Sequence, residues 1–369
     1  MYPLQGIFFY QDCHIFEKMF SVKDNKQPFP AFIKLLMLCI LFSCNEKKEP
    51  RAIEPSFYYW KSILTLTDFE KQKLDSLKVK TIYIKFFDVA WDETTGKPVP
   101  EAKLQVANKE QLKGFSVIPT VFITNECIQK IDPSQTKDLG EKIMGLLRIM
   151  IDETDLDSIP EVQIDCDWTE STRDRYFDIL KTIKSLKPNA KLSATIRLHQ
   201  VKFLTKTGVP PVDRGLLMCY NMGNLKDPGT KNSILETEEL KKYTGNLSLY
   251  PLPLDVAFPL FNWKVLYRNN VYSGLIQNLP DSVFTSSFST RTGNRYLVLK
   301  DTLLQGYDLK KGDMIRDEQI DINELLSTAK EINEHLKNTV LRVSLYHLDS
   351  VILSKYSTHE LESIYNSLH

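Results

Sequence analysis

Eight short strand-like runs, separated by stretches with the spacing of amphipathic helices, constrain the fold of this 369-residue chain more than any other feature. Strands that alternate with helices pair in parallel, because a parallel connection needs a crossover long enough to hold a helix. Eight such units predict an α/β fold, a closed (β/α)8 TIM-type barrel, rather than an open sheet. The expected strands are residues 56–60, 81–87, 117–123, 161–168, 191–198, 214–220, 252–261 and 340–346.

The helices expected between these strands have recognisable start signals. Thr67 or Asp68 begins a helix that runs to about Leu77, and Ser171 caps one over residues 173–186. A last helix over residues 358–368 follows the final strand, as a barrel of this type requires. The barrel is therefore expected to cover residues 56–369.

Residues 262–320 break this alternation. Two β-rich runs, 284–290 and 296–299, flank Arg291-Thr292-Gly293-Asn294-Arg295, which predicts a hairpin. Strand and helix signals resume afterwards, which argues against a separate C-terminal domain. We expect a small β-rich insertion near the C-terminal third, in the seventh β-to-α connection. Such connections lie on the catalytic rim of (β/α)8 barrels.

The first 55 residues are interpreted as a leader and a tether. Lysines precede an apolar run over residues 35–42, which is too short to cross a bilayer but suits a signal peptide. Leu41-Phe42-Ser43-Cys44 resembles the bacterial lipobox. Residues 1–44 are thus expected to be a lipoprotein signal peptide ending at a lipidated Cys44, with residues 45–55 as a solvated tether. The alternative for the apolar run is a buried helix. Either Met1 or Met19 is the first residue of the translated chain.

That interpretation places the protein in the bacterial cell envelope, anchored by lipid to a membrane. The outer membrane, on its periplasmic or surface face, is the expected location. Lys+Arg and Asp+Glu are both 47, so the formal net charge is zero and no nucleic-acid partner is expected.

Neither a cofactor nor a metal is expected. The chain contains no Walker loop, no G-x-G-x-x-G and no H-E-x-x-H. Beyond the leader, Cys127, Cys166 and Cys219 are an odd number without a paired spacing, so we interpret them as packed apolar side chains.

The strand Glu161–Trp168 carries acids where a core strand should have none. With a period of two, Val162, Ile164 and Cys166 share one face, and Asp165 and Asp167 the other. Carboxylates on a buried strand are costly unless partners or function retain them. The site of function is therefore expected at this strand.

The same alternation predicts a polar barrel interior, because strands wrapped by helices are apolar on the helix side. Lys85, Arg197 and Arg342 are expected to face Asp165 and Asp167. The open alternative is an internal ion network that only stabilises the barrel. Two further polar residues follow strands at the same rim, Asp88 and His199, and His199 equally suits a structural role.

Aromatic residues also gather at the expected rim. Sugar rings stack on the faces of Trp and Tyr, so a set of them at strand ends favours a carbohydrate site, although packing explains any single one equally well. The set comprises Trp60, Trp91, Trp168, Tyr220 and Trp263.

Two motifs resemble chitinase-type family 18 glycoside hydrolases. In the family's fourth-strand pattern Asp-x-x-Asp-x-Asp-x-Glu, Asp165 and Asp167 match the second and third acids, and Trp168 the usual aromatic. Val162 replaces the first Asp, and Thr169 replaces the catalytic Glu. Met218-Cys219-Tyr220-Asn221 resembles the sixth-strand Met-x-Tyr-Asp, and Ser193-Ala194-Thr195 the fifth strand. The chain also resembles uncharacterised bacterial lipoproteins of the DUF3142 type, a closer likeness.

These resemblances imply a lipid-anchored, glycoside-hydrolase-like barrel that cleaves an unidentified glycan by acid/base chemistry. Asp167 is the expected acid and Asp165 its orienting partner, and a bulge could instead bring Glu170 into the place of the missing Glu. The expected substrate contacts are Tyr220, Asn221, Arg197, Trp60, Trp168, Trp263, Lys85 and Asp88. The alternative, motivated by Thr169, is a non-catalytic carbohydrate-binding envelope lipoprotein on the same barrel; a scaffold protein is the third hypothesis.

Overall fold

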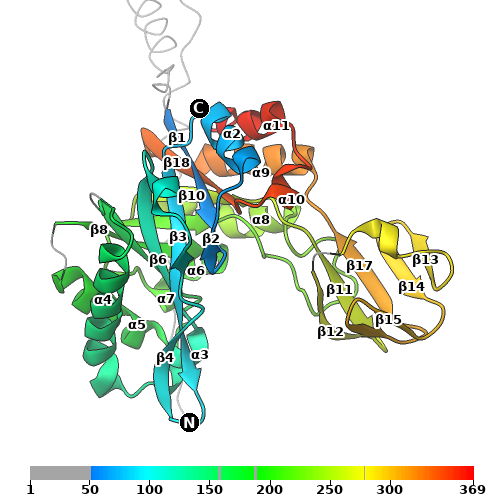
Figure 1. Ribbon diagram of the computed structural model, residues 1–369, viewed down its shortest axis with the longest axis horizontal. Coiled ribbons are helices and arrows are strands. Elements are labelled where there is room, and N and C mark those ends of the chain that lie inside the picture. The colour runs from blue at the N-terminus through cyan, green and yellow to red at the C-terminus, as the bar shows by residue number, and fades with distance from the viewer. Residues whose placement is uncertain (1–50, 157–158, 187–188, 278) are drawn as a thin grey trace, which may run out of the picture. The chain divides into compact units, whose positions relative to one another are not determined.

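The computed structural model describes residues 51–156, 159–186, 189–277 and 279–369 (Figure 1). The leader that was predicted to end at Cys44 lies outside the described residues. The first strand, β1, begins at Ala52, so the last residues assigned to the tether belong to the barrel instead. No helix within the described ranges is long and apolar enough to span a membrane.

Eight parallel strands close into a barrel, as predicted. Their order is β1-β18-β10-β9-β8-β7-β6-β3, and a pairing between β1 and β3 joins the two ends. Each expected strand is present, with its ends shifted by a few residues at most. The strands are β1 (Ala52–Tyr59), β3 (Thr81–Asp92), β6 (Ser116–Ile123), β7 (Glu161–Asp165), β8 (Lys191–Arg197), β9 (Arg214–Met218), β10 (Leu254–Pro259) and β18 (Val340–Tyr346).

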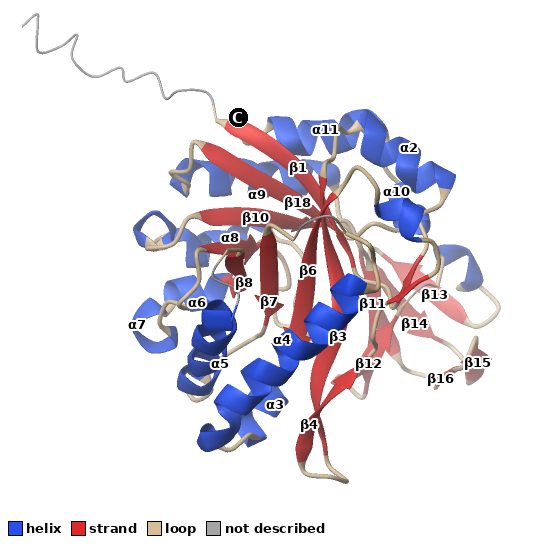
Figure 2. Cartoon of the chain, turned by 60° about the vertical axis from the view of Figure 1, so that its left-hand side comes forward, coloured by secondary structure: helices blue, strands red, loops and turns tan. Residues whose placement is uncertain are grey.

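Helices lie around the outside of these strands (Figure 2). Thr67 caps α2 through a reciprocal bond with Glu70, and Asp321 caps α9, so both helices start where short polar side chains satisfy free N–H groups. The helices are α2 (Asp68–Ser76), α3 (Asn125–Lys130), α4 (Thr136–Asp152), α5 (Arg173–Leu186), α6 (Leu198–Lys202), α7 (Leu204–Thr207), α8 (Thr237–Thr244), α9 (Ile322–His335), α10 (Ser350–Leu353) and α11 (Thr358–Asn366).

The connection from β3 to β6 departs from the β/α repeat. In place of an α-helix, β4 (Lys97–Glu101) folds back antiparallel to the end of β3. A two-residue strand, β5 (Gln105–Val106), then pairs with β2 (Ile63–Leu64), and a 3-10 turn over Lys109–Leu112 leads into β6.

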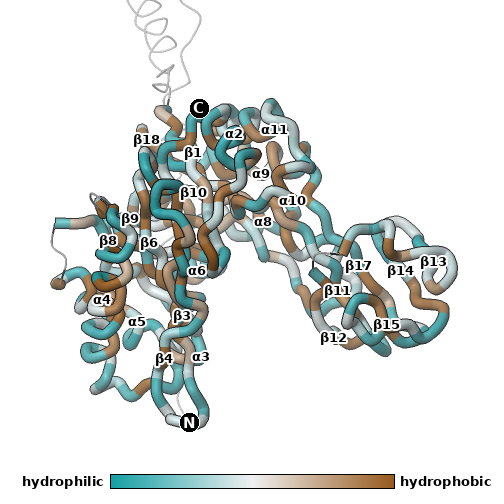
Figure 3. The backbone as a smooth tube through the Cα atoms, in the orientation of Figure 1, coloured by the Kyte–Doolittle hydropathy of each residue, from teal (hydrophilic) through white to brown (hydrophobic). Residues whose placement is uncertain are grey.

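The predicted β-rich insertion is a five-stranded antiparallel sheet in the order β12-β11-β17-β14-β13. It has its own apolar core, which includes Leu266, Tyr296 and Ile315. Figure 3 shows apolar segments along the barrel strands and a second group of them within the insertion. The strands are β11 (Trp263–Arg268), β12 (Val271–Ile276), β13 (Ser289–Thr292), β14 (Arg295–Val298) and β17 (Met314–Glu318), with a separate hairpin of β15 (Thr302–Leu304) and β16 (Tyr307–Leu309).

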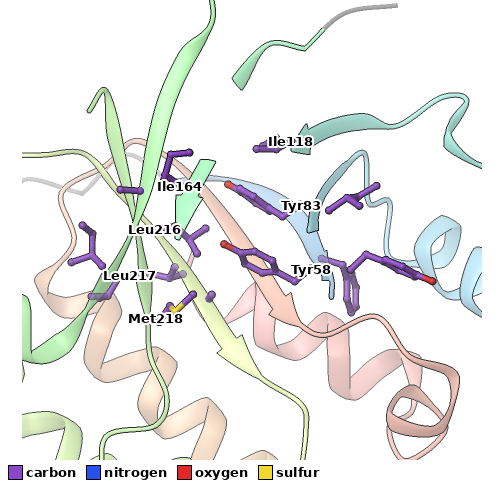
Figure 4. Close-up of a cluster of buried hydrophobic side chains, with 14 of the residues drawn as sticks. Tyr58, Tyr83, Ile118, Ile164, Leu216, Leu217 and Met218 are labelled. Atoms are coloured by element: carbon purple, nitrogen blue, oxygen red, sulfur yellow. The ribbon is translucent and has the colours of Figure 1, made fainter. Parts of the chain in front are cut away.

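The barrel interior is partly aromatic. Tyr58 on β1 and Tyr83 on β3 stack with ring centroids 4.8 Å apart, and Leu216 and Met218 of β9 lie opposite them (Figure 4). The hydroxyl of Tyr58 donates to the side chain of Gln163 across the barrel. This layer fills the middle of the barrel and leaves polar side chains above and below it.

Candidate functional site

Strand β7 is buried along its whole length and delivers its acids into the barrel. Gln163 bonds to Tyr58 from the opposite wall, and Asp165 accepts a 2.5 Å hydrogen bond from Thr195 Oγ1 on β8. Because side chains of one parity share a face, Glu161, Gln163 and Asp165 all point inward. The predicted inward face of the acid strand is correct.

An ion network occupies the N-terminal end of the barrel. Arg342 donates to Glu161 at 3.0 Å and to the hydroxyl of Tyr83 at 2.9 Å, and Asp255 accepts from Arg214 at 2.9 Å. Arg342 therefore does not face Asp165 and Asp167 as expected, because its strand register places it lower in the barrel, opposite Glu54. For this layer, the interpretation as a stabilising ion network fits.

Asp165 lies higher and is 4% exposed. Burial raises the pKa of its carboxyl to about 6, and the negative charges of Asp167 and Asp88 act in the same direction. The Arg197 guanidinium and the bond from Thr195 oppose that rise in pKa. A carboxyl with such a pKa is half protonated near pH 6, which is suited to proton transfer but requires contact with a substrate.

Asp167 follows the end of β7 and is held by Arg197 of β8. Arg197 Nε donates to one carboxylate oxygen and Nη2 to the other, at 3.2 Å. The side chain of Asp167 is 47% exposed and that of Arg197 19%. The two therefore form a two-point ion pair at the surface of the rim, with hydrogen-bonding capacity still open to solvent.

A bulge in β3 brings a second ion pair to the same side. The register with β6 shifts between Lys85 and Phe87, so that Lys85 lies opposite Thr120 and Asp88 opposite Phe122. Because of this extra residue, Lys85 and Asp88 both face inward, and Lys85 Nζ donates to Asp88 Oδ2 at 2.8 Å. The Lys85 ammonium also lies 5.6 Å from the centre of the Trp60 ring.

Five aromatic side chains meet above these acids and form what we call the rim platform: Trp60, Tyr220, Phe261, Trp263 and Tyr346. Tyr346, the last residue of β18, is its centre, with ring centroids 5.9 Å from Trp60, 5.7 Å from Tyr220 and 5.7 Å from Phe261. Trp263 packs on Phe261 at 5.2 Å. All except the buried Tyr220 are partly exposed.

Sequence reasoning missed Tyr346 and Phe261 as site residues. The signal for Tyr346 was present, since it is the last inward residue of a barrel strand. Phe261 follows β10 and gave no such signal, because its place depends on how the insertion leaves the barrel.

Trp168 does not belong to the platform, so the stacking role expected for it is wrong. Its indole is fully buried, stacks on Tyr176 of α5 at 5.1 Å and donates to the carbonyl of Thr207 at 2.9 Å. As the second residue after Cys166, it follows the side of β7 that faces the helices. Trp91 also lies elsewhere, on β3 opposite Pro98 of the β3–β4 hairpin.

Replacing Trp168 by Phe is expected to lower the free energy of unfolding by about 2 kcal/mol, because the buried carbonyl of Thr207 loses its donor. Thermal or urea unfolding measures this loss. Ligand affinity at the rim should be unchanged. A loss of ligand affinity in this variant would show that Trp168 does belong to the site.

The position of the family's catalytic Glu holds no acid in the structure. The Thr169 hydroxyl lies 3.0 Å from the Ser171 hydroxyl, in the turn before α5. Glu170 lies on the surface, with its carboxylate 3.8 Å from Lys206 Nζ. A bulge that would turn Glu170 inward is not present in β7, which ends at Asp165.

Asn221 follows Tyr220 with a positive φ of 56°, and its exposed side chain lies at the start of the β9–α8 connection. Tyr220 lies 5.8 Å from the Arg197 guanidinium, which joins the rim platform to the Asp167–Arg197 pair. In the described ranges, no group of three or more His, Cys, Asp or Glu side chains is arranged to hold a metal.

Two cavities, of about 270 and 370 Å³, lie elsewhere in the fold, and neither is lined by Asp165 or Asp167. The candidate site is therefore a surface of partly exposed rings beside an ion pair rather than one of these cavities.

No family model matches the sequence, and no curated protein sequence matches it. Solved structures do. The spore cortex-lytic enzyme SleL of Bacillus cereus matches with a TM-score of 0.51 and 13% identity, over 87% of this chain and 75% of that one. SleL of Bacillus megaterium QM B1551 gives 0.52 and 11% over the same shares. The two cortex-lytic enzymes share the fold of this chain.

A chitinase from Bacteroides thetaiotaomicron matches less well, with a TM-score of 0.49 and 12% identity over 87% of this chain and 96% of that one. At the identities of the two SleL structures, the likeness shows the fold alone. The closer likeness to DUF3142-type lipoproteins stays a prediction.

Proposed function

We propose that the rim of this barrel binds a glycan through the rim platform and does not cleave it. The observation that carries the proposal is the contact of Tyr346 with three other rings, those of Trp60, Tyr220 and Phe261, beside the exposed Asp167–Arg197 pair. All of these rings except that of Tyr220 are partly exposed. Ring faces accept the apolar face of a sugar, and a charged fork beside them accepts and donates hydrogen bonds to its hydroxyls.

The positions of the acids support binding over cleavage. Glycoside hydrolysis needs a proton donor in reach of the glycosidic oxygen. Thr169 supplies none, and Glu170 lies beside Lys206 on the surface. The carboxylates of Asp167 and Asp88 each accept from a fixed cation, Arg197 and Lys85 respectively. On this proposal, Asp167 and Asp88 stabilise the rim through their ion pairs and donate no proton to a glycosidic oxygen.

Hydrolysis is the second candidate, favoured by one observation. Burial raises the pKa of Asp165 to about 6, which is in the range of a general acid. In that case Asp165, rather than the Asp167 predicted from the sequence, would carry the proton, with the Asp167–Arg197 pair as its electrostatic partner.

The two candidates are separated by assaying the protein against chitotetraose and solubilised peptidoglycan glycan strands. The first probe follows from the family 18 resemblance of the acid strand, and the second from the cortex-lytic activity named for the two SleL structures. Isothermal titration should detect binding, with no reducing ends released. Release that is abolished by Asp165→Asn would establish hydrolysis, and no binding to either probe would refute both candidates.

We also propose the lipid anchor, on the strength of the lipobox-like run before Cys44. Cells fed an alkyne fatty acid should label the full-length chain but not a Cys44→Ser variant. Equal labelling of the variant, or a wild-type chain without label, would exclude the anchor.

A further inference from the structure

Glu318, at the end of β17 in the insertion, is a buried acid with three donors from three parts of the chain. Its side chain accepts from Arg316 Nε at 2.6 Å, from the Ser233 hydroxyl at 2.6 Å and from the indole N–H of Trp263 at 2.7 Å. Both Glu318 and Arg316 have fully buried side chains. A buried carboxylate is expensive unless its oxygens are satisfied, and here both oxygens are.

The bond to Trp263 determines how the indole lies. Indole has a single N–H donor and only two side-chain torsions, so fixing that donor fixes the ring plane. The ring also packs on Phe261, 5.2 Å away, which in turn packs on Tyr346. Glu318 therefore fixes the orientation of Trp263 at one end of the rim platform, although Glu318 is not itself part of the platform.

The same network also contacts the connection that carries Tyr220 of the platform. Ser233 lies in the connection from β9 to α8, which also contains Tyr220 and Asn221. Further bonds tie this connection to the insertion: Arg316 Nη1 donates to the carbonyl of Asp227 at 2.7 Å, and Asn232 Nδ2 to the carbonyl of Gln319 at 2.9 Å. The insertion and this connection thus meet at Glu318 and its neighbours on β17.

We propose that Glu318 is the positioning residue of the rim platform: it orients Trp263 and fixes the β9–α8 connection so that their aromatic rings form one surface. Its effect on ligand affinity rests on the proposed glycan binding, whereas its effect on Trp263 does not. On this proposal, the β-rich insertion stabilises the barrel rim and is not an independent binding module.

The geometry supplies two contrasting variants. Glu318 Oε2 accepts from both Trp263 and Ser233, and Oε1 accepts from Arg316. Glu318→Gln can keep its carbonyl oxygen toward Trp263 and Ser233, whereas Glu318→Leu removes every acceptor. Because both Gln and Leu leave Arg316 as a buried cation without a carboxylate partner, the double variant Glu318→Leu/Arg316→Leu is included; it removes the Trp263 acceptor without that cost.

Asp313 supplies the matched control. It is a buried carboxylate next to the other end of β17 and accepts from Arg268 at 3.0 and 2.8 Å. Asp313→Asn weakens an ion pair of the same sheet without touching Trp263.

The test is hydrogen exchange of the Trp263 indole N–H by NMR in the full-length folded chain, with its signal assigned by its loss in Trp263→Phe. Exchange should be at least about tenfold faster in Glu318→Leu and in the double variant, and close to wild type in Glu318→Gln and Asp313→Asn. Unchanged exchange in the double variant, or equal acceleration in Asp313→Asn, would overturn the positioning role whether or not any glycan binds.

Affinity for chitotetraose is the second readout. Glu318→Leu should weaken binding roughly tenfold and should cost less than that in a Trp263→Phe background, because Phe has no N–H to hold and only the bond to Ser233 is then lost. An additive loss in the double-mutant cycle would contradict action through Trp263. Absence of binding by the wild type would refute the proposed function and leave the exchange result to decide the positioning role.

Discussion

Replacing Asp165 by Asn is expected to raise the free energy of unfolding at pH 7.5 by about 2 to 3 kcal/mol. The carboxyl is buried and has its pKa raised to about 6, so above that pH its charge must be accommodated in the barrel. A carboxamide has no charge to accommodate and keeps an oxygen that accepts from Thr195. Denaturant unfolding of the two proteins measures the difference.

The raised pKa of Asp165 determines how the free energy of unfolding changes with pH. The unfolded carboxyl titrates near pH 4, the folded one near 6, so the folded state binds the proton more tightly and the wild type loses stability as pH rises between these values. The gain from Asn should therefore be complete above about pH 6.5 and vanish near pH 4. Asp213 is the control: its pKa is lowered, and Asp213→Asn should destabilise at neutral pH. A gain independent of pH would contradict the account of Asp165.

Tyr346→Ala is expected to weaken glycan binding by about thirtyfold and to lower the free energy of unfolding by about 3 to 5 kcal/mol. The ring contacts Trp60, Tyr220 and Phe261, so its removal separates the rest of the platform. Titration with chitotetraose or glycan strands, below the unfolding temperature of the variant, measures the affinity.

Two controls separate binding from stability in that experiment. Tyr346→Phe keeps the ring and should keep most of the affinity. Tyr176→Ala removes a fully buried ring that packs on Trp168, away from the rim, and should cost at least as much stability without loss of affinity. If Tyr346→Ala loses no more affinity than Tyr176→Ala, the rim platform is not the binding surface.

The barrel could be predicted because its signals are local. Each strand alternates with a period of two, and several helices begin at a polar capping residue, as α2 does at Thr67 and α9 at Asp321. The inward face of β7 followed from the same alternation. The predicted contact of Arg342 with the rim acids was wrong, because alternation gives the face of a strand but not the height of a residue in a staggered barrel.

The rim was harder to predict, since it depends on irregular features. The bulge at Phe86 brings Asp88 inward beside Lys85, and no residue type marks that bulge in the sequence. Trp168 was predicted to be a rim aromatic because it ends the expected strand 161–168. In the structure it lies past the end of a shorter strand and packs toward α5. Glu318 carried no signal at all, because its three donors are brought together only by the insertion.

The four tryptophans of the chain provide the most direct test of the central claim, that the rim platform binds a glycan without cleaving it. In an NMR titration with chitotetraose and with peptidoglycan glycan strands, the indole signals of Trp60 and Trp263 should shift, those of Trp91 and Trp168 should stay, and the glycan's own reducing-end signals should not grow. Indole signals that stay fixed with both glycans, shifts confined to Trp91, or growing reducing-end signals would contradict it.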